Sequence, residues 1–415
     1  GDTMGVAFDV DTGKLWFSKN NTWISGDPAD GSSPSITVPS AELANDLYPW
    51  GASASNTHYQ RYDFGQLGFA YTPPTGFEAL STANFNDPTI ADPSGSFQTT
   101  LYTGNDGSNE IDQTGNSTFE PNLVWLKERS GGNHGTIIDS VRGGNKGIYP
   151  SLNNAEYTET NLSFDADGFS LSARGSAAQI NKTGETYVGW QWLEGATPGF
   201  DIVSFTGNAT NRTISHSVGV APEFMVVKNL ADTDNWAVYH ASNTSAPETD
   251  YLILNTDAAT ADDATIWNDT APTSSVFSVG TSSLTNGNTE AMIAYLWAGV
   301  EGFSKFGSYE GNGDADGPFV WCGFKPAWLC IKCSSGIENW FVGDNKRLGY
   351  NLGNRPMLSP NTAAAENTSW SGNAPFDLLS NGFKIRRTGD SFNTDGGTYL
   401  FIAFANTPFK TATAR

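Results

Sequence analysis

The sequence has few basic residues and few cysteines for its length. Its 415 residues include 22 Lys and Arg against 44 Asp and Glu, which gives a formal net charge of −22 at pH 7. A surface of that sign repels phosphate backbones and anionic membranes, so nucleic-acid binding is disfavoured. No apolar run has the length needed to span a bilayer, which argues against membrane insertion. The three cysteines are an odd number and predict no disulfide framework.

Aromatic residues and glycine are abundant. The 25 Phe, 14 Tyr and 13 Trp residues provide material for packed cores, and the 45 glycines indicate frequent tight turns, as in β-proteins. A chain of this length predicts two to four domains. It opens on GDTMGVAFDVDTGK, with glycine in place of methionine and no signal peptide. We therefore expect a piece of a longer or processed polypeptide.

A pattern of about 103 residues occurs three times. Each copy contains a proline followed by an apolar run that ends in lysine, and these runs read PNLVWLK, PEFMVVK and PAWLCIK. Each copy closes on an aromatic-rich run, and these runs read YVGWQW, MIAYLW and YLFIAF. We place the first, second and third repeat at residues 97–196, 200–299 and 303–410, after a linker at 77–96.

The runs that recur in the three repeats, which we call landmarks, are typical of β-strands. Each is a run of four to seven residues rich in Val, Ile, Phe, Tyr and Trp, bounded by turn-forming residues. One repeat can supply about five to seven strands, enough for a small antiparallel sandwich. The sequence therefore predicts an all-β protein with three tandem β-sandwiches, arranged like beads in series.

The run WLCIKC in the third repeat has the C-x-x-C spacing of zinc ligands and redox pairs. Cys330 takes the place of Trp125 and Val226 in the other two repeats. Because successive side chains of a strand alternate between faces, Cys330 and Cys333 should point to opposite sides. We predict that Cys330 is a small buried apolar residue and that Cys322, Cys330 and Cys333 bind no metal.

The sequence shows no recognisable catalytic constellation. The histidines have no metal-type spacing, and His240 takes the place of Asp139 and Asp344 in the other repeats. Neither G-x-S-x-G nor H-E-x-x-H occurs, and no glycine loop that cradles phosphate. We therefore predict a protein that is not an enzyme and needs no cofactor. A glycosidase carboxylate pair can hide among 44 acidic residues, so a glycan hydrolase is the alternative.

Short acidic runs recur in the repeats. They read DGSNEID at 106–112, DADG at 165–168 and GNGDADG at 311–317. Carboxylate and carbonyl oxygens in such loops can bind calcium weakly. Asp-Gly turns between strands explain the same residues without an ion. We expect turns, with weak calcium binding as the alternative.

The first 76 residues follow a different pattern. GVAFDVDTGKLWFSK alternates apolar and polar residues on both sides of DTG, which predicts a β-hairpin. GDTMGVAFDVDTGKLWFSKNNTW resembles the central hairpin of a SPRY domain, a concanavalin-like β-sandwich that serves recognition. The resemblance implies that residues 1–76 are the C-terminal part of such a sandwich. A SPRY domain has several strands before GDTMGVAFD, and the sequence lacks them.

The resemblance extends to the tail proteins of marine (cyanophage-like) bacteriophages. It is carried by YDFGQLGFAYTPPTGFEAL and, in the first repeat, by FQTTLYTGN, PNLVWLKERS, DSVRGGNKG, DADGFSL and TYVGWQW. It implies an extracellular location on the virion surface, with other virion tail proteins and a host cell-surface glycan as partners. Phage fibres usually gain stability by association, which implies a homo-oligomer, with a trimer as the first expectation.

Aromatic residues outside the recurring register are the best candidates for ligand contact. Tyr48, Trp50, Tyr59 and Tyr62 lie in the loop-like stretch DLYPWGASASNTHYQRYDFG. Flat rings beside amides and hydroxyls suit the faces and hydroxyls of sugars. We predict a tail fibre or adhesin that binds a host glycan through these four residues without catalysis. The alternatives are a glycan depolymerase and a structural fibre that decorates the capsid or tail.

Overall fold

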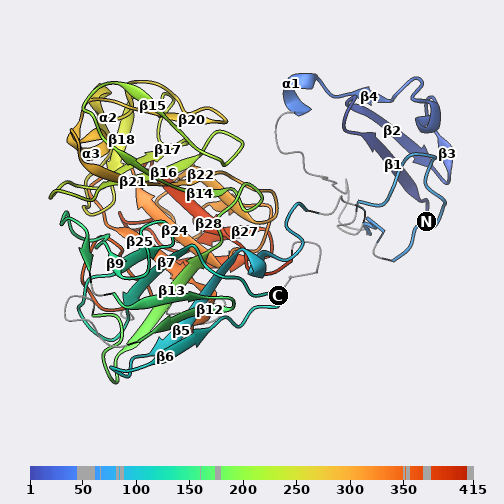
Figure 1. Ribbon diagram of the computed structural model, residues 1–415. Coiled ribbons are helices and arrows are strands. Elements are labelled where there is room, and N and C mark those ends of the chain that lie inside the picture. Colours follow the sequence, from blue (N-terminus) through green and yellow to red (C-terminus); the bar gives the residue numbers. More distant parts are fainter. Residues whose placement is uncertain are drawn as a thin grey trace. The chain divides into compact units, whose positions relative to one another are not determined.

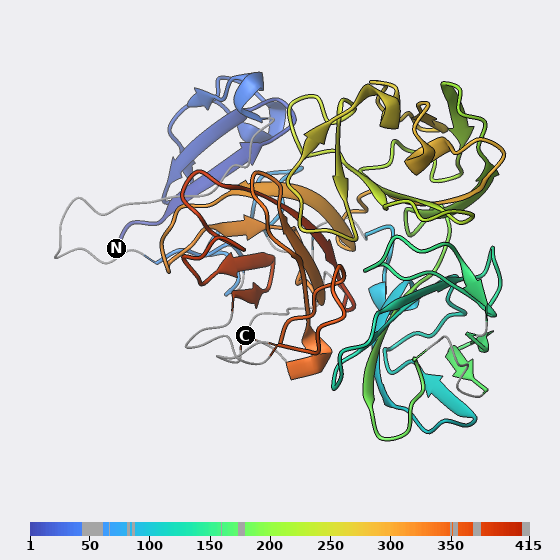
Figure 2. The ribbon, with the colours of Figure 1, turned by 90° about the vertical axis from the view of Figure 1, so that its left-hand side faces the viewer.

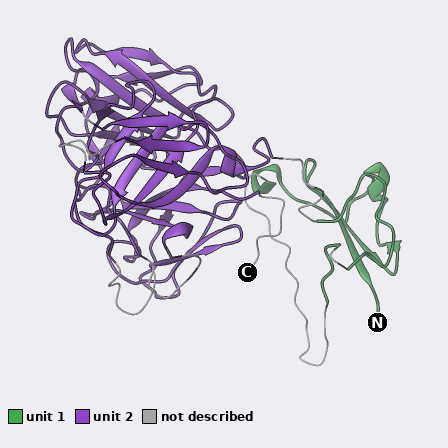
Figure 3. Cartoon of the chain, turned by 60° about the horizontal axis from the view of Figure 1, so that its bottom comes forward, with its two compact units in different colours: residues 1–87 green, residues 88–415 purple. Residues whose placement is uncertain are grey.

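The computed structural model describes residues 1–43, 61–65, 67–80, 84, 88–158, 160–172, 179–348, 351, 356–367 and 375–408. The chain divides into two compact units, residues 1–87 and 88–415 (Figure 3). Strands dominate both units, and the sheets are antiparallel (Figure 1). The predicted all-β class is confirmed.

Residues 1–87 contain the predicted hairpin. Strand β1 (Met4–Asp9) pairs with β2 (Lys14–Lys19), and the Asp9 carboxylate accepts the backbone N–H of Thr12 at 3.2 Å in the connecting turn. The hairpin is confirmed, whereas the SPRY-like fold of residues 1–76 stays a prediction. The other elements of this unit are β3 (Thr22–Trp23), η1 (Pro28–Asp30), β4 (Ile36–Thr37) and α1 (Ser40–Leu43).

Within residues 88–415, each repeat builds a sheet with the same strand order, and we call these the inner sheets. The first repeat gives β5 (Phe97–Thr103), β13 (Thr186–Trp192), β7 (Leu123–Glu128) and β8 (Thr136–Asp139). The second gives β14 (Phe200–Thr206), β21 (Ala291–Trp297), β16 (Phe224–Asn229) and β17 (Ala237–His240), extended by β18 (Asp250–Ile253) and β19 (Ala261–Asp262). The third gives β22 (Ser304–Glu310), β28 (Thr398–Phe404), β24 (Trp328–Cys333) and β25 (Trp340–Asp344).

A second, smaller sheet in each repeat packs on one face of the inner sheet, and we call it the outer sheet. The outer sheets are β6 (Asn109–Asp112), β12 (Gly168–Leu171) and β11 (Leu162–Asp165); β15 (Arg212–Ser215) and β20 (Val276–Val279); and β23 (Phe319–Trp321), β27 (Gly382–Ile385) and β26 (Phe376–Leu379). The remaining elements are β9 (Lys146–Gly147), β10 (Tyr157–Thr158), η3 (Pro93–Gly95), α2 (Ala264–Trp267), α3 (Ser283–Asn286) and α4 (Asn345–Leu348). The exact boundaries of the three repeats stay a prediction.

Alternate side chains of the inner strands enter different cores. In β24, Cys330 lies in a core shared by all three repeats, whereas Cys333 lies in the core between the two sheets of the third repeat. Cys330 is 3 % exposed. The predicted opposite orientation of the two cysteines and the burial of Cys330 are confirmed. Burial of both faces also explains why these strands read as continuous apolar runs.

The shared core joins the three inner sheets. In this core the ring of Trp192 lies 6.2 Å from that of Trp297 and 5.8 Å from that of Phe404, so one aromatic residue of the first repeat contacts both the second and the third repeat. Figure 2 shows the repeats as lobes of successive colours, cyan-green, yellow and orange-red. The predicted beads in series are wrong. A bead buries its apolar residues within itself, whereas here the apolar faces of the inner sheets cover one another.

Polar contacts between neighbouring repeats close the arrangement into a ring. Asp139, His240 and Asp344 occupy equivalent positions in the three repeats, and each contacts the next repeat in the ring. The contacts are Tyr295 Oη donating to Asp139 at 2.7 Å, His240 Nε2 donating to the Phe401 carbonyl at 3.2 Å, and Trp190 Nε1 donating to Asp344 at 3.2 Å. The third repeat thereby returns to the first.

Three buried lysines also form contacts between neighbouring repeats. Lys127, Lys228 and Lys332 end the apolar runs identified in the sequence, and each is at most 2 % exposed. Each ammonium group donates to a backbone carbonyl of the preceding repeat in the ring, namely Thr362, Asn153 and Asp257, at 2.9, 3.2 and 3.1 Å. Burial lowers the pKa of each lysine to about 8. The lysines therefore tie the repeats together.

Candidate ligand-binding surface

Most of the predicted ligand-contact residues lie outside the part of the chain that the structure describes. These are Tyr48, Trp50 and Tyr59. Tyr62 is described, and 48 % of its surface is exposed. A site formed by these four residues stays a prediction.

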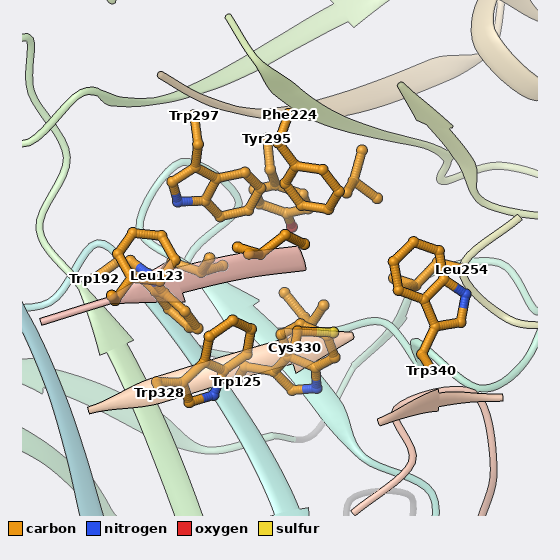
Figure 4. A pocket seen from close by; sticks show the side chains of 14 residues that line it. Leu123, Trp125, Trp192, Phe224, Leu254, Tyr295, Trp297, Trp328, Cys330 and Trp340 are labelled. Carbon is orange, nitrogen blue, oxygen red and sulfur yellow. The ribbon is translucent and has the colours of Figure 1, made fainter. Parts of the chain in front are cut away.

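The shared core encloses a cavity of about 30 Å³ (Figure 4). Side chains of all three repeats line it, among them Trp125, Tyr295 and Cys330. That volume corresponds to about one water molecule, and a water needs two or more polar partners to stay in a cavity. Because the lining surface is apolar, we interpret the cavity as a dry packing gap.

The acidic runs include a turn at 166–167 and bends at 106–107 and 313–316, and the first run continues into β6. The Asp106 carboxylate accepts the backbone N–H of Thr183 at 3.1 Å, and the Asp314 carboxylate accepts that of Asp316 at 2.9 Å. Asp165 accepts a hydrogen bond from the hydroxyl of Ser170. Among the described residues, no group of three or more His, Cys, Asp or Glu side chains is placed to hold a metal ion. Calcium binding at these turns remains the alternative interpretation.

A pair of carboxyl groups lies where the first repeat joins the second. Burial and a hydrogen bond with Asp201 raise the pKa of Glu194 to about 7. Glu194 also accepts the backbone N–H of Ile202 at 3.1 Å, and Asp201 accepts that of Ser217 at 2.5 Å. Asp201 is 6 % exposed, whereas Glu194 is partly buried, and we interpret the pair as a contact that stabilises the joint. It gives no support to the hydrolase alternative.

Two exposed aromatic side chains stand on the outer sheet of the third repeat. They belong to β23, the edge strand of the order β23-β27-β26. Val320 points into the core of the repeat, while Phe319 and Trp321 point outward and are 43 % and 41 % exposed. Residues two apart along a strand have Cα atoms about 6.6 Å apart and side chains on the same face of the sheet. We call this pair the aromatic platform.

The other two repeats show that the fold does not need these rings. Ile111 pairs with Phe169, and Ile214 pairs with Phe277, just as Val320 pairs with Phe383. The positions of Phe319 and Trp321 are therefore occupied by exposed polar residues in the other repeats, namely Glu110 and Asp112, and Thr213 and Ser215. Large apolar side chains side by side on a surface indicate a contact site, because water opposes their exposure.

Cationic side chains surround the aromatic platform. Lys305 Nζ lies 3.9 Å from the centroid of the Trp321 ring, a cation–π contact that holds the ring. Lys384 lies directly across from Phe319 on β27. Lys384 Nζ and Arg386 Nη1 lie 3.0 and 3.5 Å from the same oxygen of Asp316. A chain with twice as many acidic as basic residues thus places three of its cations beside two exposed rings.

A signal in the sequence could have revealed the aromatic platform. The stretch GPFVWCG in the third repeat aligns with polar stretches of the other two, so its aromatic residues also lie outside the recurring register. The rule that selected Tyr48, Trp50, Tyr59 and Tyr62 selects Phe319 and Trp321 as well. They were missed because β23 is short and contains none of the landmarks that define the repeats.

The described residues form an all-β protein whose three joined sandwiches expose the aromatic platform on the outer sheet of the third repeat. Residues 92–408 match the family model described as "Domain of unknown function (DUF7483)", and the chain belongs to that family. No curated protein matches the chain. Among the described residues, no helix has both the length and the apolar character that crossing a membrane requires.

Proposed function

We propose that the protein binds a cell-surface glycan through Phe319 and Trp321 and does not change the glycan chemically. The observation that carries the proposal is the exposure of both rings at positions where the first and second repeats have polar residues. A role in the fold does not account for them, since two copies of the same architecture form without them.

The chemistry of the surface supports a sugar as the ligand. Aromatic rings on a flat sheet stack against the C–H faces of sugar rings, and neighbouring polar groups bind the hydroxyls. Lys305 holds Trp321 in place, which reduces the conformational entropy lost on binding.

The resemblance to phage tail proteins supports the surface of a virion as the location and a host envelope as the source of the glycan. A shallow site with two rings is expected to bind with a dissociation constant near the millimolar range. Several copies on one particle convert such contacts into strong attachment, because each bound copy raises the effective concentration of the next. The proposed homo-oligomer, with a trimer as the first choice, would serve this avidity.

The double variant F319T/W321S tests the aromatic platform, because it installs the residues that the second repeat has at these positions. We expect at least a tenfold loss of binding to an immobilised panel of neutral and acidic polysaccharides, measured by biolayer interferometry. Since both substituted side chains are exposed, the free energy of unfolding should change by no more than about 1 kcal/mol. A matched control is L101S, which replaces an apolar side chain on the first repeat that is 37 % exposed, and it should bind like the unmodified protein.

The outcomes separate the alternatives. Binding by the double variant that equals that of the unmodified protein would refute the aromatic platform. Shortened polymer with new reducing ends would support the depolymerase instead. Failure of the unmodified protein to bind any polysaccharide of the panel would favour the alternative function, a structural fibre.

A further inference from the structure

We propose that the aromatic platform selects glycans that carry carboxylate groups, such as uronic acid polymers, and that Asp316 occupies the carboxylate site when no glycan is bound. The inference rests on the proposed function for the stacking of a sugar on Phe319. It goes beyond that function by naming the charged group of the ligand and the residues that bind it.

Asp316 has the geometry of a bound anion. Its Oδ1 lies 3.0 Å from Lys384 Nζ and 3.5 Å from Arg386 Nη1, while its side chain remains 78 % exposed. The hydrogen bond and charge of Lys384 lower the pKa of Asp316. An ion pair this exposed contributes little stability. A carboxylate from a ligand can therefore replace that of Asp316 at small cost.

The position of the two cations fits a sugar stacked on the aromatic platform. Lys384 and Phe319 are direct cross-strand neighbours, and such side chains lie about 5 Å apart on the same face of a sheet. A carboxylate on a sugar ring above Phe319 is then within reach of the ammonium group. Arg386 is held in place by Asp377, whose carboxylate lies 2.6 Å from Arg386 Nε, so its guanidinium is oriented before the ligand arrives.

The first and second repeats have neither the two rings nor a cation at the position of Lys384. Glu110 and Thr213, which correspond to Phe319, face Ser170 and Ser278 where the third repeat has Lys384. Ring and cation therefore occur together in one repeat. The overall negative charge does not prevent binding, because charges farther than about 8 Å are screened at physiological ionic strength.

The variant D316N gives the sharpest test, because it is expected to strengthen binding. Removing the internal competitor should lower the dissociation constant for polygalacturonate about three- to tenfold and leave that for its methyl ester, the same polymer without charge, unchanged. The matched control is D112N, which makes the same charge change on the exposed edge strand of the first repeat. It should alter the dissociation constants for both polymers by less than twofold.

A second variant and a third polymer complete the experiment. K384M should weaken binding to polygalacturonate at least fivefold and retain binding to the methyl ester. Equal affinity of the unmodified protein for the two polymers, or no effect of D316N, would overturn the inference and leave the proposed function standing. Tighter binding to dextran sulfate than to polygalacturonate would overturn the choice of a carboxylate. Binding only to neutral members of the panel would refute the anion site alone, whereas binding to none would refute the proposed function too.

Discussion

Replacing Asp344 by alanine is expected to lower the free energy of unfolding of residues 88–415 by about 3 kcal/mol. The side chains of Asp344 and Arg347 are both 0 % exposed, and their ion pair measures 2.7 Å. Asp344 also accepts the indole N–H of Trp190 from the first repeat. Without the carboxylate, the Arg347 guanidinium stays buried and keeps Glu366, at 3.1 Å, as its acidic partner.

Urea denaturation followed by tryptophan fluorescence measures this loss. The control is D316A, the same change at an exposed aspartate, which should leave the free energy of unfolding nearly unchanged. A loss below about 1 kcal/mol for D344A would contradict the role of Asp344 in closing the ring.

Replacing Trp328 by alanine is expected to cost about 3–5 kcal/mol, because it opens a large cavity in the shared core. Trp328 is 2 % exposed. Its ring lies 6.0 and 5.9 Å from those of Trp190 and Trp192 in the first repeat, and 5.8 Å from that of Phe404 in its own repeat. Since these contacts join two repeats, the loss should reach beyond the third repeat.

Calorimetry of the W328A variant tests this cooperativity. Residues 88–415 should still unfold in one transition, shifted as a whole to lower temperature. The control W321A makes the same substitution on the exposed platform and should leave the transition near its original temperature. A transition that splits, with part of it unshifted, would mean that the repeats unfold independently. That result would support an arrangement of independent β-sandwiches in series.

The strands could be predicted from the sequence because local pattern determines them. The landmarks ending in Lys127, Lys228 and Lys332 are strands with the expected register, and alternation placed Cys330 and Cys333 on opposite faces. The ring could not be predicted in the same way. Contacts such as that between Asp139 and Tyr295 join residues 156 positions apart, and no local pattern records them.

One signal of the ring was nevertheless present. The closing runs YVGWQW, MIAYLW and YLFIAF show almost no polar alternation, which indicates burial of both faces. An isolated two-layered sandwich buries one face of each sheet and exposes the other. Strands apolar on both faces therefore require a third layer, and the inner sheets of the neighbouring repeats provide it.

Part of the candidate site could be predicted from the sequence and part could not. Phe319 and Trp321 could be recognised by comparing the repeats, since polar residues take their places elsewhere. Lys384 could not, because its closeness to Phe319 depends on the pairing of β23 with β27. Asp316 belongs to the acidic run at 311–317, but its ion pair with Lys384 could not be read from the sequence. Strand pairing brings together residues that are far apart in the sequence, so this part of the site cannot be seen in the sequence alone.

Hydrogen–deuterium exchange in the presence of the tightest-binding polysaccharide of the panel tests the central claim most directly, because it locates the bound glycan. We predict slower amide exchange in residues 311–323 and 376–387, which contain the aromatic platform and its cations, with unchanged exchange in the corresponding segments 105–113 and 208–216. Slower exchange centred on residues 48–62, or equal slowing in the outer sheets of all three repeats, would contradict the assignment of the binding site to Phe319 and Trp321.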